Sequence, residues 1–167
     1  MTGDPLDGRI ARFQPEEGNE GLFIDAVIPG HARRIWSVIG PNVGEDRSES
    51  PAIPPEDFNL AIVSAAPGNG AGLHTHTTVE VFMPLTGRWE IFYGERGERH
   101  VVLAQWDVCS VPPGVWRGFR NAGDEDAFLL ALLGGTDAGR LTWAPQVIEE
   151  AARRGKTLDE TGYMDED

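Results

Sequence analysis

The stretch G-N-G-A-G-L-H-T-H-T-T-V-E-V-F-M-P-L-T-G, residues 68–87, sets two histidines one residue apart and a carboxylate four residues further on. Alternate side chains of a β-strand lie on one face, so the imidazoles of His74 and His76 are expected roughly 7 Å apart, near enough to bind one ion. Glu80 has the same parity. Two neutral imidazoles and one carboxylate suit divalent iron, manganese, nickel, copper or zinc, and the set with open coordination positions suits oxygen chemistry in particular. The stretch therefore predicts the outline of a metal site.

The residues around these three ligands distinguish them from a chance pair. An isolated His-x-His is more often part of an ordinary solvent-facing strand than a pair of ligands. Here a glycine-rich turn precedes the histidines, a strongly apolar run follows over 79–85, and Gly87 ends that run. In this frame the stretch resembles the first motif of the cupin superfamily: glycine, five residues, His-x-His, three or four residues, Glu, six residues, glycine. Every position matches, and the resemblance implies a small double-stranded β-helix, or jelly-roll barrel.

A second stretch, W-D-V-C-S-V-P-P-G-V-W-R-G-F-R-N at 106–121, resembles the second cupin motif, which runs glycine, five residues, Pro-x-Gly, two residues, His, three residues, Asn. Three of its positions are in register: Pro112, Gly114 and Asn121. Trp106 stands where the first glycine is expected, and the adjacent Asp107 still offers a turn residue. Arg117 stands where the resemblance places a fourth metal ligand, a histidine.

Arg117 changes the chemistry, because a guanidinium has no lone pair to give a metal and the three-His, one-Glu site cannot form. In one arrangement His74, His76 and Glu80 hold the ion alone and Arg117 binds an anionic group of the substrate. In a second, no metal binds and Arg117 pairs with Glu80 as a buried ion pair that orders a ligand pocket. In a third, Arg117 swings outward to solvent. A cation about 5 Å from a divalent ion costs roughly 7 kcal/mol at an effective dielectric of about 20, which favours either a bridging anion or an empty site.

Composition limits the class of protein. The 167 residues fit one domain that can bury a core without disulfides. The formal net charge of -13, from 27 acidic and 14 basic residues, argues against nucleic acid or an anionic membrane as partner. Cys109 is the one cysteine and lies in an apolar alternating run, so a small buried side chain is expected. Neither an export signal nor a membrane span is indicated, and a cytoplasmic protein is expected.

The N-terminal third is less regular. Residues 3–18 are polar and broken by proline and glycine, with one short extended candidate at 9–13, and are expected on the surface or across a partner subunit. Strands are expected over 21–28 and 33–39. Both faces of the second carry apolar residues, which suits a strand between the barrel interior and another layer or a subunit interface. Residues 41–57, rich in proline and acids, are expected to form a long loop, a solvated connection in preference to a lid.

The rest of the chain predicts further short strands and one helix. Strands are expected over 58–66 and 126–133, and a hairpin joins 88–93 to 98–103 through G-E-R-G. His100 lies just past that turn and is expected to be exposed and not a ligand.

Residues 144–154 predict the helix, with Pro145 in its first turn and Gly155 as its terminator. The tail beyond it is polar and expected to be loosely ordered, except for a contact from Tyr163. About ten strands and one C-terminal α-helix give an all-β fold, the double-stranded β-helix or cupin barrel that the resemblance implies.

One structural domain is expected, in three parts. Residues 1–57 supply N-terminal strands and the acidic loop to the barrel or a dimer interface, 58–135 form the barrel core, and 136–167 form the helix and tail. No second His-x-His motif occurs, so a single cupin domain is predicted. A homodimer is expected.

The function predicted is that of a metal-binding cupin acting on a small, anionic organic molecule as a dioxygenase-type oxidoreductase, with iron favoured as the metal at His74, His76 and Glu80. Arg117 would anchor the anion. Four aromatics are candidate pocket walls, with plain core packing at least as good an account of each: Phe82, Phe92, Trp116 and Phe119. The alternatives are a metal-free or non-catalytic small-ligand-binding cupin, and a metal-dependent isomerase or lyase with the same ligands.

Overall fold

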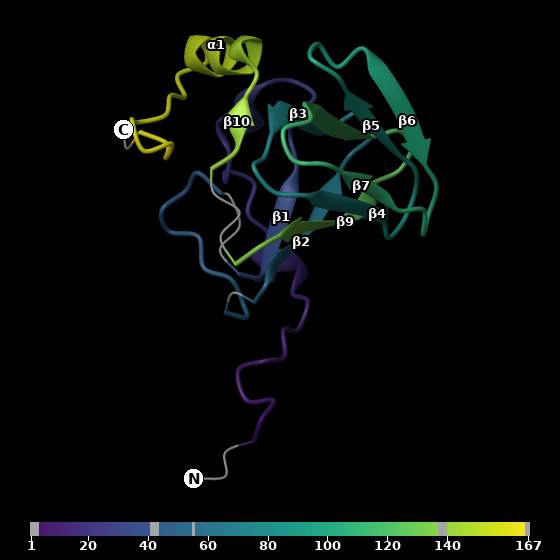
Figure 1. Ribbon diagram of the computed structural model, residues 1–167, viewed down its shortest axis with the longest axis vertical. Coiled ribbons are helices and arrows are strands. Elements are labelled where there is room, and N and C mark those ends of the chain that lie inside the picture. The colour runs from purple at the N-terminus through teal and green to yellow at the C-terminus, as the bar shows by residue number, and fades with distance from the viewer. Residues whose placement is uncertain (1–3, 41–43, 55, 137–139, 166–167) are drawn as a thin grey trace.

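Two five-stranded antiparallel sheets face each other in the computed structural model, which describes residues 4–40, 44–54, 56–136 and 140–165 (Figure 1). The first sheet has the strand order β1-β2-β9-β4-β7, and the second has the order β10-β3-β8-β5-β6. The described residues contain ten strands and one α-helix. This arrangement confirms the predicted all-β jelly roll with a C-terminal helix.

A long connection joins β1 to β2, and from β2 to β9 the strands follow one another with short connections. Their bounds are η1 Pro15–Glu17, η2 Ile24–Val27, β1 Arg34–Ile39, β2 Phe58–Ala65, β3 Gly70–Thr75, β4 Glu80–Pro84, β5 Trp89–Tyr93, β6 Arg99–Leu103, β7 Cys109–Val111, β8 Arg117–Asn121, β9 Ala127–Gly134, β10 Thr142–Trp143 and α1 Pro145–Arg153.

Alternation of side chains along the strands sorts residues between the barrel interior and its outside. In β2, every second residue is buried and those between are partly exposed. The inner faces of the two sheets meet in one core, whose largest fully buried apolar side chains include Phe82, Trp89, Ile91 and Leu129. Each such side chain stabilises the fold by about 1.5–3 kcal/mol relative to exposure, so the barrel holds together without disulfides.

Most of the predicted elements are present within one or two residues of their expected bounds. The strands β1, β2 and β9, the hairpin β5–β6 and the helix α1 all lie where the sequence pattern places them. Cys109 is half-buried and free. No helix among the described residues is long and apolar enough to span a membrane.

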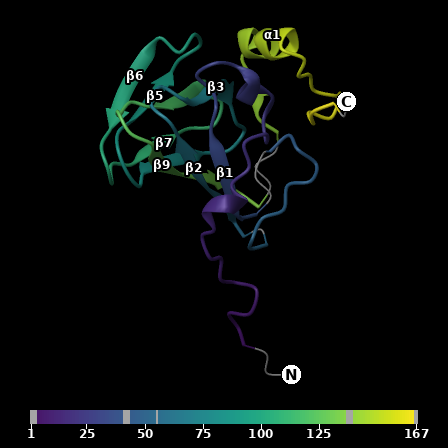
Figure 2. The same ribbon diagram turned by 180° about the vertical axis from the view of Figure 1, so that it is seen from behind.

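The strand predicted over 21–28 is wrong, because the 3-10 helix η2 occupies that segment. The backbone N–H of Ile24 donates to Oε2 of the buried Glu45 at 2.7 Å, and the Asp25 carboxylate points inward to pair with Arg33. These partners satisfy polar groups that a strand would have offered to a neighbouring strand. The extended candidate at 9–13 forms no strand either. Its Phe13 ring packs on Trp36 of β1, while the N-terminal end of the chain runs away from both sheets in Figures 1 and 2.

The predicted loop at 41–57 and the C-terminal tail lie against each other. Residues 41–43 and 55 lie outside the described residues, and the described remainder of the loop contains an isolated bridge between Ile39 and Ile53 but no strand. The expected Tyr163 contact is present: the guanidinium carbons of Arg140 and Arg47 lie 3.6 Å and 4.1 Å from its ring centroid. Cation–π contact of this kind orders a tail that composition alone described as loose.

Trp106 stands at the motif position where glycine was expected, and it takes the backbone conformation that glycine would have taken. Its φ is 73°, in the left-handed region that costs a residue with a Cβ about 1 kcal/mol. Oδ2 of Asp107 accepts the Ala104 N–H at 2.8 Å, which agrees with the turn role expected of Asp107. The turn thus has a left-handed residue at this position although a tryptophan stands where glycine was expected.

Candidate metal centre

The three predicted ligands come from two neighbouring segments of the barrel. His74 lies near the end of β3, His76 lies just after that strand, and Glu80 is the first residue of β4. All three side chains are buried, and one ligand atom from each lies within 4.8 Å of the others. The chain leaves β3 and turns before β4 begins, so a carboxylate four residues from His76 faces both imidazoles from the opposite sheet.

Hydrogen bonding determines which nitrogen of His74 faces the carboxylate. Its Nδ1 lies 2.7 Å from the carbonyl oxygen of Gly72, which can only accept, so Nδ1 carries the proton. Nε2 of His74 then has the lone pair, 4.0 Å from Oε2 of Glu80, and Nε2 of His76 lies 3.7 Å from the same oxygen. Both Nε2 atoms therefore converge with a carboxylate oxygen, as ligands of one ion must.

The protonation states are those of metal ligands. Burial, reinforced by the positive charge of Arg117, lowers the pKa of His74 to about 3. Burial lowers the pKa of His76 as well, with neighbouring His74 and Arg117 acting in the same direction. Both imidazoles are thus neutral near pH 7 and have lone pairs to donate.

Arg117 is buried beside these ligands, so the arrangement in which it turns outward to solvent is wrong. Its Nε donates to Oε2 of Glu80 at 2.8 Å, and its Nη1 donates to the carbonyl oxygen of Val115 at 2.9 Å. Burial raises the pKa of Glu80, although the charge and hydrogen bond of Arg117 act against that shift. The ion pair weighed as the second arrangement is present.

Two buried polar atoms here have no hydrogen-bond partner among the described residues: Nη2 of Arg117 and Nδ1 of His76. Buried polar groups are satisfied in the great majority of cases, so unsatisfied ones mark a place for a ligand, ion or water. Two neutral Nε2 atoms and a carboxylate are also a donor set that fits a divalent transition metal. The residues therefore fit such an ion. The positive charge of Arg117 opposes it, because the Arg117 Nε–H is bonded to Oε2 of Glu80, the oxygen nearest both imidazoles.

The ligands open onto a cavity of about 50 Å3. That volume accommodates a few water-sized ligands, whereas sites for larger organic molecules run to roughly 300–1,000 Å3. Its walls are mainly apolar and include Phe23, Phe119, Leu141 and Trp143. Such walls exclude bulk water and strengthen electrostatic interactions at the ligands.

The four predicted pocket aromatics have different positions. Phe119 lines the cavity, and Phe82 is buried beside it with ring centroids 5.3 Å apart. Phe92 and Trp116 pack against the core without lining the cavity. His100 lies exposed on β6, as expected, with Nδ1 3.2 Å from Oε1 of Glu90, and does not belong to the ligand group.

The two sequence motifs did not identify Phe23 and Trp143, which line the cavity beside the ligands. The Trp143 ring lies 5.3 Å from the His74 ring and comes from β10, while Phe23 comes from the turn before η2. Both segments lie outside the two motifs. Their only sequence signal is an aromatic side chain in an otherwise irregular stretch, which core packing explains equally well.

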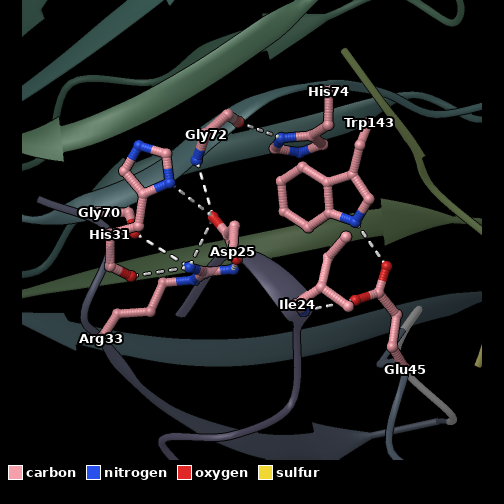
Figure 3. A network of polar contacts seen from close by, with 9 residues as sticks. All are labelled: Ile24, Asp25, His31, Arg33, Glu45, Gly70, Gly72, His74 and Trp143. Atoms are coloured by element: carbon pink, nitrogen blue, oxygen red, sulfur yellow. Dashed lines mark hydrogen bonds and ion pairs between the residues drawn. The ribbon is translucent and has the colours of Figure 1, made fainter. Parts of the chain in front are cut away.

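A network of polar contacts around Asp25 reaches His74 through Gly72 (Figure 3). The buried Asp25 accepts two hydrogen bonds from Arg33, at 2.9 Å and 3.0 Å, and one from the Gly72 N–H at 2.9 Å. Gly72 therefore connects Asp25 to His74, because its carbonyl accepts the His74 proton. Partners of this kind fix the orientation of a ligating imidazole.

Glu45 ends this network on the Trp143 side. Its Oε1 accepts the Trp143 Nε1–H at 2.5 Å, and its Oε2 accepts the Ile24 N–H. Burial raises the pKa of Glu45 to about 7, against the effect of these two donors. The carboxyl thus holds in place the indole that packs on His74.

Comparison with known proteins agrees with the fold. The family model described as Cupin domain matches residues 61–133. A cupin 2 domain-containing protein from Halorhodospira halophila superposes with a TM-score of 0.53 at 19% identity, over 76% of this chain and 85% of that chain. A Cupin 2 conserved barrel domain protein from Salinispora arenicola superposes at 0.52 and 20% identity, over 87% and 97%. A cupin-like protein from Thermotoga maritima superposes at 0.51 and 22% identity, over 74% and 84%.

These solved structures support the fold alone, because their identities to the chain are low. No curated protein sequence matches the chain significantly.

Proposed function

Residues 61–133 belong to the cupin family, and from this premise we propose that the chain is a metal-binding cupin acting on a small, anionic organic molecule as a dioxygenase-type oxidoreductase. The observation that carries the proposal is the buried convergence of His74, His76 and Glu80 on one small cavity. Iron held there, in preference to manganese, nickel, copper or zinc, would supply redox chemistry with dioxygen. The apolar walls would keep bulk water from the reacting groups.

Arg117 gives the proposal its substrate class. Its Nη2 is buried without a partner among the described residues, and a carboxylate or similar anion would accept a hydrogen bond from it. The same anion would offset the repulsion between the guanidinium and a divalent ion, about 7 kcal/mol at ~5 Å. The small cavity favours a compact substrate, or one whose anionic end alone enters.

A metal-free ligand-binding cupin is the second candidate, and one observation favours it. The 2.8 Å bond from Arg117 uses the Glu80 oxygen that lies nearest both imidazoles, so the two side chains can neutralise each other without a metal. A metal-dependent isomerase or lyase would use the same three ligands and would differ only in its substrate. We also propose a cytoplasmic location, which the single free Cys109 supports.

Elemental analysis of the purified chain separates these candidates. We expect about one transition-metal ion per chain in the wild type, and less than about a tenth of that in His76→Ala, which removes one of three ligands. His100→Ala is the matched control and should keep the wild-type metal content, because that histidine pairs with Glu90 outside the site. A folded wild type that stays metal-free after incubation with iron, manganese or zinc would sink the metal proposal and favour the binding module.

Arg117→His tests the position of the arginine. A fourth imidazole in place of a cation should raise metal affinity by at least about tenfold, measured by competition with a chromophoric chelator. Unchanged affinity in a folded variant would contradict the view that residue 117 stands at a ligand position.

A further inference from the structure

A second cavity lies between the two sheets, on the side of the barrel where β6 and β7 run (Figures 1 and 2). In the described part of the chain, β6 is the last strand of the second sheet and β7 is the last strand of the first. The cavity has a volume of about 640 Å3, within the range of small-molecule sites, whereas the cavity at the metal ligands has only about 50 Å3. Its apolar walls include Ile91, Val101, Val111 and Val115. We name it the β6–β7 groove.

One row of side chains joins the β6–β7 groove to the metal ligands. Arg99 of β6 and Tyr93 of β5 both line the groove and pair in register. Tyr93 pairs in turn with Arg117 of β8, and Arg117 pairs with His74 of β3. Side chains paired in register share one face of a sheet, and strands lie about 4.8 Å apart, so the row covers about 14 Å from the open edge to the first ligand. The groove and the candidate metal centre are therefore two parts of one inner face.

The wall on the side of the first sheet shows the same continuity. Val111 lines the groove and pairs in register with Glu80. The carbonyl oxygen of Val115, another residue of the wall, accepts the hydrogen bond from Nη1 of Arg117. The ion pair between Arg117 and Glu80 thus lies directly behind the groove, and Nη2 of Arg117 is the buried donor left without a partner among the described residues.

Charges of opposite sign lie outside and inside the groove. Glu95 and Glu98 belong to the exposed turn of the β5–β6 hairpin, where Oε2 of Glu98 accepts the Arg96 N–H at 3.0 Å. Arg99 lies beside this turn in the groove, and Arg117 is fully buried behind the wall. An elongated anion is repelled by the acidic turn and attracted by the buried guanidinium, so its charged end is directed inward.

We propose that the β6–β7 groove binds the body of an organic anion with an apolar chain or ring, whose anionic group points inward along the row to Nη2 of Arg117. The proposal rests on the proposed function for the anionic class of the substrate, and it requires no metal. The apolar walls bury the body of the molecule, for which the cavity at the ligands has no room. Tyr93, half-buried between Arg99 and Arg117, is the side chain that the anionic group passes.

Cys109 gives a direct readout of occupancy, because it is the one cysteine of the chain and its half-buried side chain lines the groove. Octanoate is the probe, and 1-octanol is its uncharged counterpart. In metal-free protein, octanoate at about 2 mM should slow alkylation of Cys109 by iodoacetamide at least about threefold, as mass spectrometry measures. Octanol at the same concentration should slow it less, because it offers no charge to Arg117.

Two neighbouring residues of β6 supply the test variant and its matched control. Val101→Asp places a like charge in the groove and should abolish the protection by octanoate. Val102→Asp makes the same change one residue on, at an exposed side chain that pairs with Glu90 on the outer face, and should keep wild-type protection. Arg117→Met should remove the preference for octanoate over octanol. Near-UV circular dichroism checks that each variant is folded.

Unchanged reactivity of Cys109 in octanoate would overturn the proposal. So would protection that survives Val101→Asp, equal protection by octanol, or a preference for octanoate that survives Arg117→Met. Elemental analysis tests the metal separately. A metal-free chain with protected Cys109 keeps the groove and loses the dioxygenase, whereas a metal-loaded chain without protection loses the groove alone.

Discussion

Two buried arginine–carboxylate pairs lie in the same barrel, and they differ in how completely their atoms are bonded. Arg33 donates two bonds to Asp25 and two more to the carbonyls of His31 and Gly70. Arg117 donates one bond to Glu80 and one to a carbonyl, and its Nη2 has no partner among the described residues. The first pair is complete within the chain. The second pair leaves one buried donor, Nη2 of Arg117, without an acceptor among the described residues.

The carboxyl groups show the same difference. Burial acts to raise the pKa of Asp25, but the charge of Arg33 and the hydrogen bonds from neighbouring groups outweigh it and leave that pKa below its ordinary value. Burial of Glu80 outweighs the effect of Arg117, and the pKa of that carboxyl is raised. A fully bonded pair is expected where an ion pair serves the fold. A partly bonded pair beside two neutral imidazoles is expected where a ligand completes the site.

Replacing the arginine of each pair with methionine tests this difference most directly. Arg33→Met should lower the free energy of unfolding by about 3–5 kcal/mol, because it leaves the Asp25 charge buried and two carbonyls without their donor. Urea unfolding followed by tryptophan fluorescence measures the change. Arg34→Met is the control: Arg34 pairs with Glu20 at the exposed edge, and its loss should cost less than about 1 kcal/mol. Equal losses in the two variants would contradict the structural role of Asp25 and Arg33.

Glu45 is a third buried carboxyl to set beside Asp25 and Glu80. It accepts hydrogen bonds from two N–H donors, and no cationic side chain among the described residues bonds to it directly. Its pKa of about 7 in the folded chain is above its ordinary value of 4.5, so the folded state binds the proton more tightly. The stability gained from this group is complete below pH 4.5 and is lost as the pH rises to about 7. Between pH 5 and pH 8 the wild type should therefore lose about 2 kcal/mol relative to Glu45→Gln.

Urea unfolding at both pH values measures this relative loss, and Glu149→Gln on the exposed side of α1 should leave the wild-type dependence unchanged. A wild type and a Glu45→Gln variant with parallel pH dependence would contradict the raised pKa.

Arg117→Met should have the smallest effect on stability, about 1–2 kcal/mol, because it removes two hydrogen bonds where Arg33→Met removes four. Methionine fills a similar volume in apolar surroundings, and the raised pKa lets Glu80 take up a proton at modest cost. Urea unfolding of metal-free protein measures it. A loss as large as that of Arg33→Met would mean that Glu80 and Arg117 serve the fold and not a ligand.

Much of the fold follows from local sequence patterns. The strands β2 and β9 were predictable because side chains alternate or both faces are apolar, and the β5–β6 hairpin because G-E-R-G interrupts two such runs. The helix α1 was predictable from Pro145, its apolar stripe and Gly155. The 3-10 helix η2 was not, because its conformation depends on Arg33 and Glu45, which are 8 and 21 residues away from their partners.

The sequence by itself determined the double-stranded β-helix barrel and the three residues that could hold a metal, because both depend on short motifs in which turns and strand alternation place the side chains. Only the tertiary structure decided how Arg117 behaves, since its partner Glu80 lies 37 residues earlier on the opposite sheet. It also decided that Asp25, Glu45 and Trp143 support the site, because their contacts join segments that no motif connects. Whether a buried charge is satisfied depends on every group packed around it, and that information is not local.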